Sequence, residues 1–84
     1  MDRSEEWLLG ELGDGWTKSA DGIYYPPGIA APDPADPVSL RRRRAELVRL
    51  YEPTAERAAA FPNPVLERQV KALADAIADI DSRL

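Results

Sequence analysis

The segment that decides the fold is the last one, residues 64–84, which reads PVLERQVKALADAIADIDSRL. Its apolar residues recur at alternating steps of 4 and 3, the heptad spacing of a helix with one apolar stripe. A helix with such a stripe needs a second helix to pack against, in this chain or in a partner. We predict that the residues of this stripe form a protein interface; they are Leu66, Val70, Leu73, Ile77, Ile80 and Leu84.

The segment before it offers a matching apolar face. The connection at residues 61–64 is short, which favours antiparallel neighbours. A parallel coiled coil is the alternative, but the positions that flank the stripe provide no ion pairs for it. We therefore predict an antiparallel helical hairpin over residues 38–84. Its first helix would present Leu40, Leu47, Tyr51, Ala55 and Ala58, with Arg44 as the polar interruption.

Two similar signals mark the starts of these helices. Asp36-Pro37 and Asn63-Pro64 each combine a capping side chain with a proline at the first helical position. Within the first helix, Pro53 lacks an N–H and disfavours helical geometry at the residue before it. We therefore predict a break or kink at Pro53, with a further helical segment up to about Phe61.

The first 28 residues predict a short helix followed by a β-hairpin. Asp2 or Ser4 can cap the helix, and Gly13 is a suitable end for it. Asp21-Gly22 lies between two short segments with aromatic and β-branched residues, which is typical of a hairpin turn. The aromatic residues of this region form either a small core under the hairpin or anchors in an interface. We predict an interface role for Trp16, Tyr24 and Tyr25.

A proline-rich strap connects the two parts. Residues 26–37 include five prolines among twelve residues. This composition predicts an extended, polyproline-like conformation and neither helix nor sheet. The strap is either a stiff linker or an arm that lies across a partner. The sequence thus predicts a mainly α protein with three parts: helix plus hairpin at 1–28, strap at 29–37 and helical hairpin at 38–84.

The main cluster of charge consists of five arginines, of which four are consecutive in the sequence. Four consecutive side chains of a helix point in all directions, so these four arginines do not form one stripe. Some of them would pair with Glu46 or with the acidic first third, and the others would be solvated or contact an acidic partner. The alternative is a small nucleic-acid-binding regulator whose phosphate contacts come from Arg41, Arg42, Arg43, Arg44 and Arg49.

Composition argues against most catalytic chemistry. The chain has no histidine and no cysteine, so ordinary zinc sites, disulfides and histidine acid–base catalysis are not available to it. Its carboxylates show no paired spacing, and its five scattered glycines do not form a phosphate-binding loop. We predict no catalytic, cofactor-binding or metal-binding residue and no small-molecule substrate.

Charge and hydropathy favour a protein partner. The net charge is −4: residues 1–36 hold eight acids and two bases, and residues 37–84 hold nine bases and seven acids. An acidic total disfavours a polyanion as the main ligand. No apolar run approaches the roughly 20 residues of a membrane span, and the acidic start is unlike a signal peptide.

We therefore expect a non-enzymatic interaction or assembly module, an adaptor or accessory structural subunit. It would bind a larger protein or copies of itself through the last helix and the strap. The composition, rich in alanine, arginine, aspartate and proline, favours a bacterial or phage origin. The expected location is cytoplasmic, or virion-associated if the protein comes from a phage.

Overall fold

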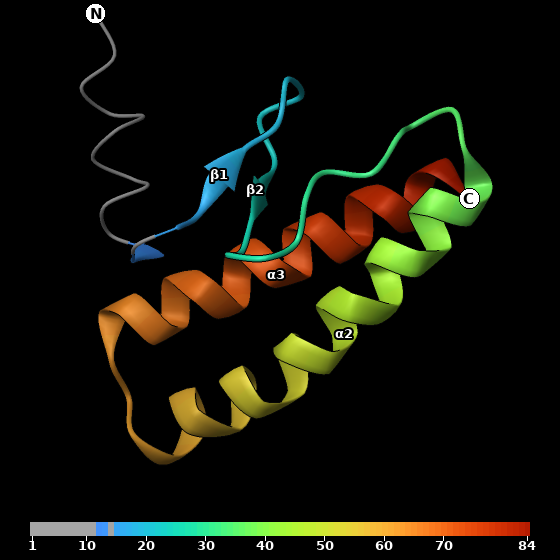
Figure 1. The fold of residues 1–84 in the computed structure, drawn as a ribbon. Helices are drawn as coiled ribbons and strands as arrows, with labels where there is room; N and C mark the ends of the chain where they lie inside the picture. Colours follow the sequence, from blue (N-terminus) through green and yellow to red (C-terminus); the bar gives the residue numbers. More distant parts are fainter. Residues whose placement is uncertain (1–11, 14) are drawn as a thin grey trace, which may run out of the picture.

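The computed structural model describes residues 12–13 and 15–84, and these form a small β-hairpin, a long loop and two antiparallel helices (Figure 1). The elements are β1 (Thr17–Lys18), β2 (Tyr24–Tyr25), α2 (Pro37–Ala60) and α3 (Pro64–Arg83). The predicted mainly helical architecture, with a small β-hairpin and a C-terminal helical hairpin, is confirmed. The helix predicted before Gly13 lies outside the described residues, apart from Leu12, which is helical.

The β-hairpin forms where the Asp-Gly pair predicted it. Thr17 pairs with Tyr25 and Lys18 with Tyr24 in antiparallel register. Gly22 has a φ of +85°, whereas no residue other than glycine has a positive φ in the described chain. The turn is therefore not the two-residue type that needs two positive φ values. It is a three-residue loop in which glycine takes the left-handed position. The amide of Gly22 donates to the carbonyl of Ser19 at 3.0 Å, and that of Ser19 to the carbonyl of Ile23 at 2.8 Å.

The strap is less extended than predicted. It begins with a turn in which the Ile29 amide donates to the Pro26 carbonyl at 3.2 Å, and Gly28 takes a φ of +83°. Proline followed by glycine at the centre of a turn is typical of type II. Ile29 is then 9% exposed and belongs to the main core. The strap is therefore anchored to this chain's own helices, at least at Ile29, and does not run free between two parts.

Helix α2 begins at its predicted cap and is longer than predicted. The Asp36 carboxylate accepts from the Val38 amide at 3.0 Å, with Pro37 in the first turn. The prediction was a break or a kink at Pro53; a break is wrong, because α2 is one helix from Pro37 to Ala60, and a kink stays a prediction. Pro53 is exposed, so the carbonyl of Arg49, which loses its helical partner there, can be hydrated.

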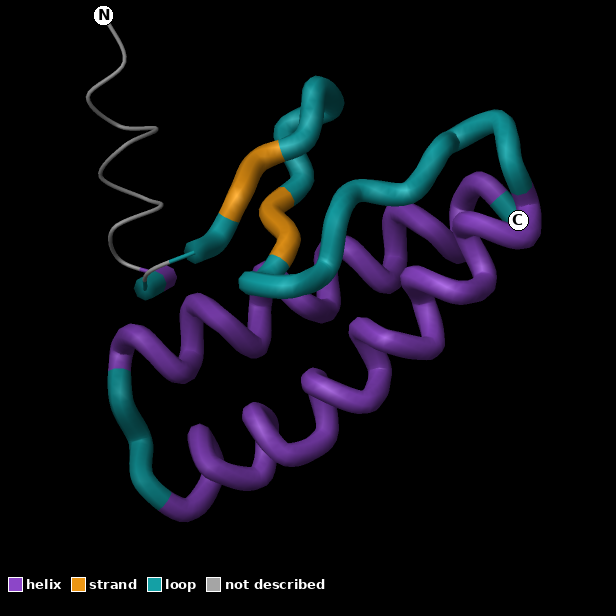
Figure 2. The backbone as a smooth tube through the Cα atoms, viewed as in Figure 1, coloured by secondary structure: helices purple, strands orange, loops and turns teal. Residues whose placement is uncertain are grey.

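Helix α3 also begins at its predicted cap, since the Asn63 side chain accepts from the Val65 amide at 2.8 Å. Before it, the Phe61 amide donates to the Arg57 carbonyl at 2.8 Å and ends α2. The short connection turns the chain back so that α3 lies antiparallel to α2, as Figure 2 shows.

The core lies towards the end of the helical hairpin where α2 begins and α3 ends. Trp16, Ile23, Tyr51 and Ile77 pack against this core and are partly buried. The buried cluster itself draws on β2, the strap and both helices, and consists of Tyr25, Ile29, Leu40, Leu47, Leu73, Ala76 and Ile80.

Replacing Leu47 by alanine should destabilise the protein much more than the same change at Leu50. Leu47 is fully buried and Leu50 is 38% exposed, although both lie on α2. Removing a buried leucine costs about 2–5 kcal/mol, including the cavity it leaves. Urea unfolding followed by circular dichroism measures both variants against the parent chain. Equal losses for the two variants would contradict the placement of the core.

Candidate functional site

The three aromatic residues predicted as interface anchors lie in different environments. Tyr25 is 2% exposed and is part of the core, so it is not available to a partner on the folded chain. Trp16 packs against the core and is partly buried. Tyr24 is also partly buried, and the Lys18 ammonium lies 5.8 Å from the centre of its ring. Only Trp16 and Tyr24 therefore keep accessible surface.

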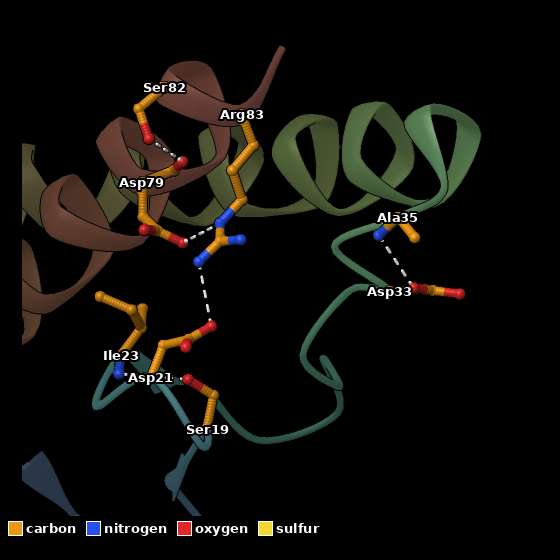
Figure 3. Close-up of polar contacts among 8 residues, drawn as sticks. All are labelled: Ser19, Asp21, Ile23, Asp33, Ala35, Asp79, Ser82 and Arg83. Atoms are coloured by element: carbon orange, nitrogen blue, oxygen red, sulfur yellow. Dashed lines mark hydrogen bonds and ion pairs between the residues drawn. The ribbon is translucent and has the colours of Figure 1, made fainter.

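A polar bridge joins the turn of the β-hairpin to the end of α3 (Figure 3). The Arg83 guanidinium donates to Asp79 at 3.1 Å and to Asp21, in the turn, at 3.0 Å. The hydrogen bond to Asp79 raises the pKa of Arg83 above its ordinary value. Both carboxylates are held by this cation. The cavity beside them measures about 30 Å³, which is room for a water molecule and not for a substrate.

Tyr25 lies beneath this bridge with a raised pKa. Burial is the largest cause, because it disfavours the phenolate, and the negative charge of Asp79 adds to it. The positive charge of Arg83 acts in the opposite direction, and Asp21 raises the pKa slightly further. The tyrosine therefore stays a neutral core residue to higher pH than a free one.

The predicted apolar stripe of α3 divides into a buried part and an accessible part. Leu73 and Ile80 are fully buried inside the chain, so their packing partner is this chain's own core. Leu66, Val70 and Ile77 are partly buried, and Leu84 is 53% exposed. A role in contacts with another protein stays a prediction, and for the folded chain it concerns the accessible members.

The half of the helical hairpin around the connection has no buried residue. From residue 48 to residue 71, every residue is exposed or partly exposed. Phe61 is 76% exposed, Val65 39% and Leu50 38%. We call residues 48–71 the connection half. Sequence reasoning missed its three large exposed apolar residues, because Leu50 and Val65 lie off the predicted stripes and Phe61 lies in the predicted turn.

A groove runs from the β-hairpin into the connection half. It has a volume of about 310 Å³ and is lined by Trp16, Pro26 and Pro27 on one side and by Leu50 and Thr54 of α2 on the other. Leu73 and Gln69 of α3 also line it. The groove thus places a predicted anchor, Trp16, beside an exposed leucine of α2.

The arginine cluster is divided by its surroundings. Arg43 pairs with Glu46 at 2.9 Å, as predicted, and Arg44 pairs with Asp81 of α3. This second pair explains the polar interruption in the apolar face of α2. Arg41, Arg42 and Arg49 are exposed, and no ion pair involves them in the described part of the chain. Their contact with nucleic acid or an acidic partner stays a prediction.

The described residues lack two other kinds of feature, a metal-binding cluster and a membrane-spanning helix. No group of three or more histidine, cysteine or carboxylate residues among them could hold a metal ion. Neither α2 nor α3 is long and apolar enough to cross a membrane. Comparison with protein-family models, with curated proteins and with solved structures finds no match for this chain.

The raised pKa of Tyr25 predicts a loss of stability at alkaline pH that a phenylalanine would not show. Well below the ordinary pKa of 10.0 the phenol is protonated in the folded and the unfolded chain, and it adds no pH dependence. As the pH rises through this value the unfolded chain releases the proton first, so unfolding becomes more favourable. Urea unfolding from about pH 8 to about pH 11.5 compares Tyr25→Phe with the parent chain, which cancels the titration of the lysines. The same alkaline slope in both proteins would contradict the raised pKa.

Proposed function

We propose that this protein is a non-enzymatic interaction module, an adaptor or accessory structural subunit, that docks a larger protein onto the connection half of its helical hairpin. The observation that carries the proposal is the run of 24 residues, 48–71, without a buried side chain. This run includes Leu50, Phe61 and Val65 as exposed apolar residues.

The energetics of helices support this reading. Helices in proteins owe most of their stability to the packing of an apolar face, and propensity alone contributes little. The end of the hairpin that holds Leu47 and Ile80 has fully buried side chains, whereas in the connection half Tyr51 packs against this core but no side chain is buried. An apolar partner surface would bury Phe61 and Val65 and so stabilise the helices there.

The groove beside Trp16 supports a helix or an extended apolar segment as the docked element. Aromatic residues at the centre of a contact contribute more than their share of binding energy. Trp16 and Leu50 face the same groove from the β-hairpin and from α2, so one segment in the groove would contact both. The partner we propose therefore presents an apolar face to the groove and continues along α2 towards Phe61.

The residue types of the chain support a role without catalysis. The sequence has no histidine and no cysteine. Asp21 and Asp79, the carboxylates beside the cavity of about 30 Å³, are both paired with Arg83. We propose no cofactor for this protein.

A photo-crosslinking amino acid at position 61 should capture one defined partner when the protein is expressed in its native host. The same amino acid at Ala78, an exposed position of α3 outside the connection half, serves as the matched control and should not capture that species. Mass spectrometry identifies the partner, which is then purified for binding measurements.

Replacing Phe61 and Val65 together by serine should weaken binding of the purified partner by about tenfold or more, because apolar anchors at an interface carry most of its energy. Both residues are exposed, so the variant should keep the circular dichroism and the unfolding midpoint of the parent chain. Unchanged affinity in a folded variant would exclude the connection half as the docking surface.

A further inference from the structure

The turn of the β-hairpin contains a chemically labile pair of residues, Asp21-Gly22. Glycine has no Cβ, so its backbone nitrogen can closely approach the side-chain carbonyl carbon of a preceding aspartate. Attack of that nitrogen closes a succinimide ring, which water reopens either to aspartate or to isoaspartate. The other aspartates of α2, α3 and the strap are followed by residues that hinder this attack, since each has a side chain or is a proline.

The turn leaves room for this ring. Asp21 and Gly22 are both exposed at the tip of the hairpin. Among the described residues, the nearest atom to a Cβ placed at Gly22 is the Cε of Lys18, at 3.8 Å. Packing therefore does not prevent ring closure, and protection has to come from polar contacts.

Two polar contacts oppose the reaction in the folded chain. The Arg83 guanidinium donates to the Asp21 carboxylate at 3.0 Å and directs it towards the end of α3 (Figure 3). The Gly22 amide, which carries the attacking nitrogen, donates to the Ser19 carbonyl at 3.0 Å. Asp79 also accepts from Arg83, at 3.1 Å, and so holds the guanidinium in place beside the turn.

The contact with Arg83 is the one that water reaches. The side chains of Arg83 and Asp21 are 32% and 60% exposed. Exposed ion pairs contribute little to stability, and contacts of this kind open without unfolding of the whole chain. The carboxylate is then free to turn towards Gly22.

We propose that Asp21-Gly22 is a site of spontaneous isoaspartate formation and that Arg83 controls its rate. The Gly22 nitrogen forms a bond to the side-chain carbon of Asp21, and a carboxyl oxygen leaves as water with the amide proton and a proton from the solvent. Water then adds to the main-chain carbonyl carbon of Asp21 and breaks its bond to Gly22. The main chain afterwards runs through the side-chain carbon, and the former main-chain carbonyl becomes a free carboxylate.

Isoaspartate at position 21 changes the hairpin and, through it, the core. It lengthens the main chain of the turn by one carbon, so the same loop no longer fits the register that pairs Thr17 with Tyr25. Tyr25 belongs to the core, which is how a change at the exposed tip reaches it. The inference is independent of the docking proposed above, because no residue of the connection half takes part in it.

Ageing of the purified protein tests the proposal. Samples are kept for several weeks at mildly acidic pH and digested with a protease that cleaves before aspartate but not before isoaspartate, and the peptides are identified by mass spectrometry. Isoaspartate should form at position 21 about two- to fivefold faster in Arg83→Gln than in the parent chain, because the exposed pair shifts the opening equilibrium by about that factor. Arg83→Lys should lie between the two, since lysine keeps the charge but not the fork of donors.

Arg49→Gln is the matched control, because it removes the same charge at an exposed position of α2. It should leave the rate at position 21 at the parent value. In concentrated urea, where the contact with Arg83 is lost, the parent chain and Arg83→Gln should react equally fast, and both faster than the folded parent.

Equal rates in the folded parent and folded Arg83→Gln would overturn the control by Arg83. The same holds for an increase that merely follows the unfolded fraction of the variant, which urea unfolding measures. Absence of isoaspartate at position 21 in both folded and unfolded chains would overturn the site itself.

Discussion

The structure depends on one buried contact, the cluster in which Leu40 and Leu47 of α2 meet Leu73 and Ile80 of α3. These four side chains are the largest fully buried ones in the described chain. A two-helix unit leaves one side of such a contact open, and here β2 and the strap close it with Tyr25 and Ile29. A chain of this size has a core only marginally large enough to fold, so the position of this cluster determines which parts of the surface are stabilised and which are not.

Polar contacts hold the same end of the molecule together. Arg44 joins α2 to Asp81 of α3, and Arg83 joins α3 to Asp21 in the hairpin turn. The charges of exposed pairs of this kind stay hydrated, so the pairs orient the elements more than they stabilise them. The connection half has no buried residue, and both of these bridges lie outside it. We propose the docking surface there for this reason. The connection half offers apolar side chains and a groove, which favour burial of a partner's apolar surface.

Local chemistry was sufficient to predict the elements from sequence. Asp36 and Asn63 cap the helices as expected, and Gly22 takes the positive φ of the turn. Residues 64–84, with their 4–3 spacing, form the expected helix. Each of these features depends only on residues a few positions away in the sequence. Tertiary structure alone decided that Pro53 sits within one helix, that Ile29 is a core residue, and that Phe61 and Val65 stay exposed. The Arg83–Asp21 pair spans 62 residues of sequence, and no local pattern encodes it. Burial depends on which distant segments pack together in the small core. The periodicity of the sequence shows which residues need burial, but it does not show which of them are buried.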